Sequence, residues 1–500
     1  MRKYLFALLV LIAYHSIYSQ ESMIIGQPQN LGKSINSPCY DYRPKISPDG
    51  KTLYFTRILC PNNDENFLFY AEKLPNGEWG EAKKFPISFN DGTNPIFVYS
   101  ISPDNNKLLI TLVLNGKRKL CTIERTSNGW SHPQPIELGI NLPDTDATFC
   151  LNNEGNVLLL TYKGNDALSE RDLYVSFLKA GKWSFPKHTG KIINNGSRIL
   201  SPFLASDGVT LYFASIRPEG LGSWDIYMTK RLDDTYTQWS EPINLGKHIN
   251  DSGHNETFVI DALGEYAYFN ANHNSFGGND IYAVKLKEKV KPNPVVLVKG
   301  KVLNKNTREP LGATVIYEFL EDGKEAGRAQ SIANNGEYQI TLNTGKKYAI
   351  LAEAKGFYSV NENLDLTNIT ESQTIHKDIY LLPLEIGQNI QLNNIFFERG
   401  KYNIKPESLH ELNRLVKLLK ENPEIKIEIA GHTNNLGPAE ANRILSENRA
   451  NEVKKYLVSQ RISPDRIRTV GYGSSRPIGD NNTEEGRKIN QRVEFMIYQK

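Results

Sequence analysis

The residues with the clearest potential for chemistry lie near the C-terminus, around Gly431-His432-Thr433 and Arg449. His432 is not expected to be catalytic, because the sequence places no nucleophile beside it, and we predict a structural role. Arg449 follows Leu445 by one helical turn on a largely apolar stripe. A buried guanidinium without a partner is costly, so Arg449 needs a carboxylate. That carboxylate can belong to a ligand or to another residue of this chain, and both alternatives stay open.

Alternating strands and helices are predicted to position these residues. Strands are expected at residues 394–397, 425–429, 466–470 and 493–497, and helices at residues 406–422 and 438–459. In the first helix, apolar side chains recur at helical spacing at Leu409, Leu412, Val416 and Leu419. The pattern predicts a C-terminal α/β domain over residues 388–500.

This segment resembles the C-terminal domain of the OmpA family over about residues 390–499. The matching words include Gly431-His432-Thr433, Leu445-Ser446, Arg449-Ala450, Gly471-Tyr472-Gly473 and Asn490-Gln491-Arg492-Val493-Glu494. Members of that family bind the peptide stem of peptidoglycan without a covalent bond, typically through diaminopimelate, which is a zwitterion. The resemblance implies the same ligand here. It also implies a site made of Thr433, Asn434, Asn435, Gly437, Asn442, Arg449 and Arg492.

One position departs from the family pattern. The family has an Asp just after the His-Thr pair and an Arg in the following helix; Arg449 matches the Arg, but the Asp position is Asn434. Losing a charge-assisted partner weakens binding by about 10–100-fold. Three interpretations follow: binding is weak but sufficient, the ligand differs at its amine, or the domain is a scaffold that no longer binds the cell wall.

An internal repeat fills the first half of the chain, with a period of roughly 50–55 residues. Each unit has a tight turn between apolar runs, as in Ser47-Pro48-Asp49-Gly50, and a third run such as Asp225-Ile226-Tyr227. Four units continue with a Trp that we expect to pack between neighbouring sheets. The aligned turn positions are 50, 106, 155, 208 and 264. The pattern predicts five β-meander units.

The fifth unit lacks its last strand, and the missing piece lies at the start of the repeat region. Residues 27–36 mirror residues 241–250, including the shared word Asn-Leu-Gly-Lys. An N-terminal strand would complete the last sheet and close a ring. The units resemble the WD40-like repeats of the TolB propeller. We therefore predict an all-β propeller of five blades over residues 26–288.

A Lys- and Pro-rich stretch, residues 289–296, is predicted to be a linker. Short β-rich runs follow, separated by Gly and Asn turns, and they predict a β-sandwich over residues 297–384. The words Gly300-Lys301-Val302, Pro310-Leu311-Gly312-Ala313 and Gly336-Glu337-Tyr338 resemble the carboxypeptidase regulatory-like domain. That resemblance implies a spacer or adhesion unit.

The N-terminus predicts export. Residues 1–19 have a basic start followed by a short apolar run, which is typical of a cleaved signal peptide, although an N-terminal anchor helix is the alternative. No later segment is apolar enough to span a membrane as a helix. An exported chain can form disulfides, so Cys39 and Cys60 can pair or remain buried thiols. The balance of 59 basic and 56 acidic residues argues against nucleic acid binding.

These features together predict a multidomain, non-enzymatic adaptor. It would reside in the periplasm, associated with the outer membrane and peptidoglycan. It would bind peptidoglycan through the C-terminal domain and an envelope protein through the propeller. No residue spacing suggests a metal, and no cofactor is expected. Two alternatives stay open: a scaffold of a type IX secretion or gliding machine, whose adaptors share this domain order, and an anchored carbohydrate-active propeller enzyme.

Overall fold

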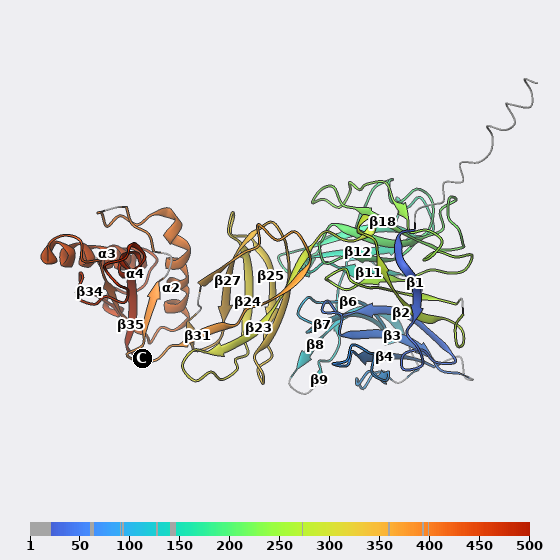
Figure 1. The fold of residues 1–500 in the computed structure, drawn as a ribbon, viewed down its shortest axis with the longest axis horizontal. Coiled ribbons are helices and arrows are strands. Elements are labelled where there is room, and N and C mark those ends of the chain that lie inside the picture. Colours follow the sequence, from blue (N-terminus) through green and yellow to red (C-terminus); the bar gives the residue numbers. More distant parts are fainter. Residues whose placement is uncertain are drawn as a thin grey trace, which may run out of the picture.

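The structure is a computed structural model that describes residues 22–60, 65–90, 92, 95–126, 129–140, 147–272, 274–358, 361–392, 395–398 and 400–500. The predicted signal peptide, residues 1–19, lies outside the described residues. The rest forms three parts along the long axis of the molecule (Figure 1): small β-sheets at one end, two further sheets in the middle, and an α/β domain at the other end.

Five separate antiparallel sheets contain the repeat units. The first is β2 (Tyr40–Ile46), β3 (Thr52–Ile58), β4 (Asn66–Glu72) and β5 (Lys83–Lys84). The second is β6 (Phe97–Ile101), β7 (Lys107–Leu114), β8 (Lys117–Thr126), β9 (Gly129–Trp130) and β10 (Gln134–Pro135). The third is β11 (Thr148–Leu151), β12 (Val157–Tyr162), β13 (Asp172–Lys179), β14 (Lys182–Trp183) and β15 (Lys187–His188). The fourth is β16 (Ile199–Leu204), β17 (Thr210–Ser215), β18 (Asp225–Lys230) and β19 (Ile243–Asn244).

The fifth sheet confirms the predicted pairing of the N-terminal segment with the last unit. It contains β20 (Phe258–Ile260), β21 (Ala267–Ala271), β22 (Asp280–Leu286) and, at its edge, β1 (Ile24–Asn30). β1 runs antiparallel to β22, with Asn30 opposite Tyr282. Strands from the two ends of the repeat region therefore complete one sheet.

Apolar side chains fill the spaces between successive sheets. One core lies between each sheet and the next in the chain, and a fifth core lies between the last sheet and the first. The Trp residues pack as predicted: Trp79 of the first sheet meets Tyr268 of the fifth at 6.1 Å, and Trp130 meets Phe85 at 5.4 Å. The innermost strands β2, β6, β11, β16 and β20 contact one another in that order, and β20 contacts β2.

The turns between the first two strands of each sheet need a left-handed residue. Gly50, Gly155, Gly208 and Gly264 take it with φ of 67–70°. In the second unit the left-handed residue is Asn105, with φ 59°, rather than the aligned Asn106. The turn of that unit therefore lies one residue earlier than predicted, and Asn is several-fold enriched among the non-glycine residues that take this conformation.

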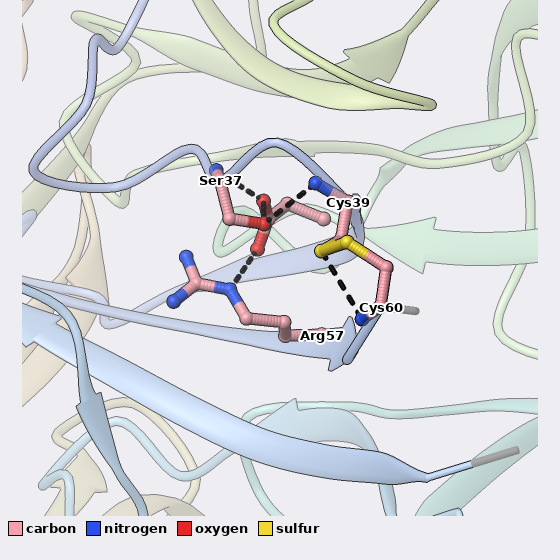
Figure 2. The surroundings of a disulfide bond; sticks show 5 residues. Ser37, Cys39, Arg57 and Cys60 are labelled. Carbon is pink, nitrogen blue, oxygen red and sulfur yellow. Dashed lines mark hydrogen bonds and ion pairs between the residues drawn. A yellow bond between two sulfur atoms is a disulfide. The ribbon is translucent and has the colours of Figure 1, made fainter. Parts of the chain in front are cut away.

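A disulfide joins Cys39 and Cys60, with their Cα atoms 5.7 Å apart, whereas Cys121 and Cys150 are buried thiols. It links the start of β2 to the end of β3, and Figure 2 shows Ser37 and Arg57 beside it. Both residues bind the buried Asp41 carboxylate, Ser37 Oγ at 2.7 Å and Arg57 Nε at 2.6 Å. Disulfides persist in oxidising compartments, so this one is consistent with export.

Two sheets with a shared core form the middle part. One has β26 (Glu337–Asn343), β23 (Val295–Asn304), β31 (Ile379–Pro383) and β28 (Phe357–Tyr358), with β30 (Gln373–His376) also paired to β23. The other has β25 (Glu325–Gln330), β24 (Thr314–Phe319), β27 (Lys347–Glu353) and β29 (Asn361–Asp365). We call these two sheets the sandwich.

The stretch predicted to be a linker is packed rather than solvated over part of its length. It contains the end of a 3-10 turn, Glu288–Val290, whose Val290 is fully buried in the core of the fourth and fifth sheets. The Tyr212 hydroxyl donates to the Val290 carbonyl. The linker is thus anchored to the repeat region before β23 begins at Val295.

The sandwich covers the turn side of the five sheets. Lys299 lies 3.3 Å from the Asp49 carboxylate, and the Gln330 amide donates to Asp104 at 3.0 Å. Gln339 Nε2 donates to the Pro103 carbonyl at 2.9 Å from a buried position. The turns of the repeat therefore also form the contact with the sandwich.

The C-terminal domain has one sheet in the order β32 (Asn389–Leu392), β35 (Val493–Gln499), β33 (Lys426–Gly431), β34 (Ile467–Gly471). Its helices are α2 (Leu409–Glu421), α3 (Ala439–Ser459) and α4 (Glu484–Asn490), with 3-10 turns at Pro406–Ser408 and Pro464–Arg466. β33 and β34 are parallel, and β35 is antiparallel to β33. Both long helices contribute to the core under the sheet.

The strand predicted at residues 394–397 is wrong in position, because the first strand is β32; Asn394 lies outside the described residues. The Phe396 backbone bonds to Ser408 Oγ and to the Lys405 amide instead of to the sheet. Phe397 forms an isolated bridge with Ile404. Residues 395–398 and 400–404 therefore belong to a folded-back segment beside α3.

Candidate functional site

The loop after β33 starts directly against α3. Ser446 Oγ of α3 accepts the Gly473 amide at 2.9 Å, and Thr433 donates its amide to the Gly473 carbonyl at 2.9 Å. A Cβ on Gly431 would lie 2.1 Å from the Ser446 carbonyl oxygen. Glycine at position 431 thus allows helix and strand to touch, which places the start of the loop beside the first turns of α3.

Asn442 shapes the loop from α3. Its Nδ2 donates to the carbonyls of Asn434 at 3.3 Å and Leu436 at 3.1 Å. The Asn434 side-chain oxygen accepts the Leu436 amide at 3.1 Å, and Gly437 has φ +93°. Asn435 is exposed and donates its amide to Asn481 at 3.3 Å. Five of the predicted site residues are therefore on this loop or hold it.

Arg449 lies on the same face of α3 as Asn442. The two residues are seven positions apart, which corresponds to two helical turns and about 10 Å along the axis. The Arg449 side chain is only 6% exposed. Its Nε donates to the Lys401 carbonyl at 3.1 Å, and the guanidinium lies over the Phe397 ring at 4.8 Å.

The Arg449 guanidinium has no carboxylate partner in the part of the chain that the structure describes. Burial lowers the pKa of Arg449 because it disfavours the charged form. The Phe397 ring and the Lys401 carbonyl hold the guanidinium in place without neutralising it. Arg449 therefore forms no ion pair with a carboxylate of the described residues, which was one of the two alternatives for its partner.

Arg492 is engaged within the domain. Its Nε pairs with Glu494 at 3.2 Å, and its terminal nitrogens donate to the Arg476 carbonyl at 3.2 Å. The Glu494 carboxylate also lies 3.0 Å from His432 Nε2, within hydrogen-bond distance. Burial raises the pKa of Glu494, but His432 and Arg492 outweigh it and hold that pKa below its usual value. His432 is fully buried and stacks on Tyr472, with ring centroids 5.4 Å apart.

Two polar atoms at the start of the loop are buried without a partner among the described residues, namely Thr433 Oγ1 and His432 Nδ1. Sequence reasoning missed Phe397, the Lys401 carbonyl, Tyr472 and Glu494. Phe397 is part of an apolar pair that predicts a strand, so nothing in the sequence indicated that it belongs to the site.

No group of His, Cys, Asp and Glu that could hold a metal ion occurs in the described ranges. In the part of the chain that the structure describes, no helix is long and apolar enough to cross a membrane.

Comparison with known proteins bears on this domain. Residues 396–491 match the OmpA family. The chain is 43% identical to outer membrane porin F of Pseudomonas fluorescens over 104 residues, 21% of this chain and 32% of that one. It is 41% identical to outer membrane protein A of Bordetella avium over 116 residues, 23% of this chain and 60% of that one. It is 40% identical to the peptidoglycan-binding protein ArfA of Mycobacterium bovis over 103 residues, 21% of this chain and 32% of that one.

The matches cover between a third and three fifths of these relatives' own length. The C-terminal domain is accordingly an OmpA-like domain. The protein is located in the cell envelope, on the periplasmic side.

Proposed function

We propose that this protein is a non-enzymatic envelope adaptor that binds the peptide stem of peptidoglycan through its OmpA-like domain. The observation that supports this most is the environment of the Arg449 guanidinium. Its guanidinium is buried, is held by Phe397 and Lys401, and lacks a carboxylate among the described residues. A preorganised arginine fork is the side chain best suited to bind a carboxylate in a desolvated site.

The ligand we propose is the diaminopimelate residue of the stem. Its carboxylate would pair with Arg449, and its ammonium would lie toward the loop of Thr433, Asn434 and Asn435. Asn442 links the two ends of the site, because it holds this loop from the helix that also bears Arg449.

Asn434 offers the ammonium an amide instead of a charge. Its side-chain oxygen already accepts the Leu436 amide, so one of its two lone pairs is occupied. We infer that binding is retained but weak at this end, and that Arg449 supplies most of the affinity. A replacement of Asn434 by Asp adds the missing charge and is expected to tighten binding about 10–100-fold.

Co-sedimentation of the full mature chain with purified sacculi tests the proposal. The wild type should pellet with sacculi, and Arg449→Met should lose about 10–100-fold in affinity, since it removes charge-assisted hydrogen bonds. Arg443→Met is the matched control, because Arg443 lies on the same helix but is exposed and paired with Glu440 and Glu447. Free meso-diaminopimelate should compete, whereas L-lysine, which lacks the second carboxylate, should not.

Retention of Arg449→Met at the wild-type level would contradict the proposed role of Arg449. Absence of the wild type from the pellet, even with Asn434→Asp, would favour the scaffold that no longer binds the cell wall. Near-ultraviolet circular dichroism of each variant separates loss of binding from loss of fold.

We also propose that the five sheets are the blades of a five-bladed propeller, and that the sandwich is a carboxypeptidase regulatory-like domain acting as a spacer. The five successive cores and the pairing of β1 with β22 support the propeller. Since the sandwich covers the turn side, the opposite side is the one that would bind an envelope protein.

A further inference from the structure

Lys45 is a buried cation in the middle of the five sheets. It lies on β2, the innermost strand of the first sheet, and its side chain is 6% exposed. Its Nζ lies 5.9 Å from the centre of the Phe203 ring on β16, and it interacts with Cys150 on β11. A side chain of the first sheet can reach the third and fourth sheets only across the centre.

The described residues provide Lys45 with no counter-charge. Within the described part of the chain, the charged and titratable neighbours of Lys45 are Arg43 on its own strand and the Cys150 thiol on β11, and neither is a carboxylate. Among the described residues the Lys45 Nζ has no hydrogen-bond partner, and it is not one of the unpartnered polar atoms that are sealed from solvent. A buried ammonium normally has a partner, because its desolvation is costly.

Arg43 adds a second cation on the same strand. A bulge in β2 between Tyr42 and Lys45 gives Arg43 a left-handed φ of 55°, and bulges often re-aim a side chain at a site. The guanidinium lies 4.1 Å from the centre of the Phe97 ring on β6 and makes no ion pair with a described residue. β2 runs toward the turn at Asp49, which the sandwich covers. Because Arg43 precedes Lys45 on β2, Arg43 lies nearer the uncovered side.

We propose that Lys45 and Arg43 form a carboxylate-binding site at the centre of the five sheets, reached from the side that faces away from the sandwich. Burial lowers the pKa of Lys45 to about 8, with Cys150 acting in the opposite direction and Arg43 in the same one. The ammonium is therefore mostly charged at neutral pH, and a carboxylate would supply its missing partner. The carboxylate can come from a small organic acid or from the end of a peptide chain.

Titration calorimetry on the full mature chain tests this site with malonate as the probe, against sodium chloride of equal ionic strength. Saturable malonate binding is expected, and Lys45→Met should weaken it about 10–100-fold, as should Arg43→Gln to a lesser extent. Lys73→Met is the matched control, because Lys73 also lies over aromatic rings, Trp79 and Tyr266, but outside the centre. Acetyl-trialanine with a free C-terminal carboxylate, and the same peptide with a C-terminal amide, distinguish a peptide end from a small organic acid. Tighter binding of the peptide with the free carboxylate than of malonate identifies a peptide end.

Absence of saturable binding for every acid, or unchanged affinity in both Lys45→Met and Arg43→Gln, would overturn the proposal. Met matches the length of the lysine stem, and thermal melting of Lys45→Met verifies that the sheets remain folded. The site does not depend on peptidoglycan binding: Lys45→Met should sediment with sacculi like the wild type, and Arg449→Met should bind malonate like the wild type.

Discussion

Asp261 is a buried acid in a turn of the repeat, and its carboxylate accepts hydrogen bonds from the backbone. It forms the turn of the fifth unit, where its carboxylate accepts the amides of Glu265 at 3.0 Å and Tyr266 at 3.1 Å. Burial raises the pKa of Asp261 to about 6, because these two bonds do not offset its desolvation. In the third unit the same position is Asn152, whose neutral oxygen accepts the amides of Asn156 and Val157.

Asp261→Asn should therefore stabilise the protein near neutral pH. The folded pKa of about 6 lies above the unfolded value of 3.8, so the stability that the protonated carboxyl contributes is complete below about pH 4 and is lost as the pH rises through 6. The gain in the free energy of unfolding should be near zero at pH 4 and reach ~1–3 kcal/mol at pH 7. Urea denaturation at several pH values measures it, and a gain that does not grow with pH would contradict the reasoning.

The segment that contains β1 and the turn after it is held by an Asn side-chain contact that recurs in other sheets. Asn36 accepts the Ile281 amide at 2.8 Å and donates to the Ile281 carbonyl at 3.0 Å. Asn250 makes the same two bonds with Ile226, and Asn194 and Asn90 do so with Leu173 and Leu68. The N-terminal segment thus uses the contact that fixes the last strand in three other sheets.

Asn36→Ala should open the edge of the fifth sheet. It leaves the buried Ile281 amide without its acceptor, which costs about 1–3 kcal/mol, whereas the Ile281 carbonyl keeps the Leu31 amide at 3.1 Å. Hydrogen exchange should accelerate in β22 and β1 before it does in the other sheets. Asn250→Ala is the matched control, since it should have the same effect on β18 and leave β22 protected; equal protection of β22 in Asn36→Ala would refute the role assigned to Asn36.

At the scale of the molecule, side chains cross both junctions between its three parts. The Tyr358 hydroxyl, from the edge of the sandwich, donates to buried Glu411 of α2 at 2.6 Å, and its ring meets Phe495 of β35 at 5.3 Å. Lys417 pairs with Glu353 across the same junction at 2.7 Å. With the contacts of Lys299 and Gln339 at the other end, these bonds hold the sheets and the OmpA-like domain at opposite ends of one elongated body (Figure 1).

Tyr358→Phe should loosen the junction between the sandwich and the OmpA-like domain. The ring can stay in the core, but Glu411 loses a buried hydroxyl donor, at a cost of about 1–3 kcal/mol. Small-angle scattering should show a broader distribution of overall dimensions, while sacculus binding stays unchanged. Tyr380→Phe, on β31 of the same sheet as Tyr358, is the control; identical scattering of both variants and the wild type would show that this hydroxyl does not fix the junction.

Local patterns in the sequence determined much of this architecture. Helical periodicity located α2 and α3, the repeated turns located five sheets, and the mirrored segments of residues 27–36 and 241–250 predicted the pairing of β1 with β22. The short helix α4 was missed, although its signal was present: Thr483 caps it by accepting the Gly486 amide. These features could be read because each depends on residues near one another in the chain.

Tertiary structure alone decided the rest, because it depends on contacts between distant residues. The apolar pair Phe396-Phe397 read as a strand, but Phe397 lies instead under the Arg449 guanidinium. Whether Arg449 has an internal partner, and whether Lys45 faces solvent or the centre of the sheets, follows from which side chains surround each of them. A sequence determines where a charge occurs, but the cost of that charge is set by the neighbours that the fold brings to it.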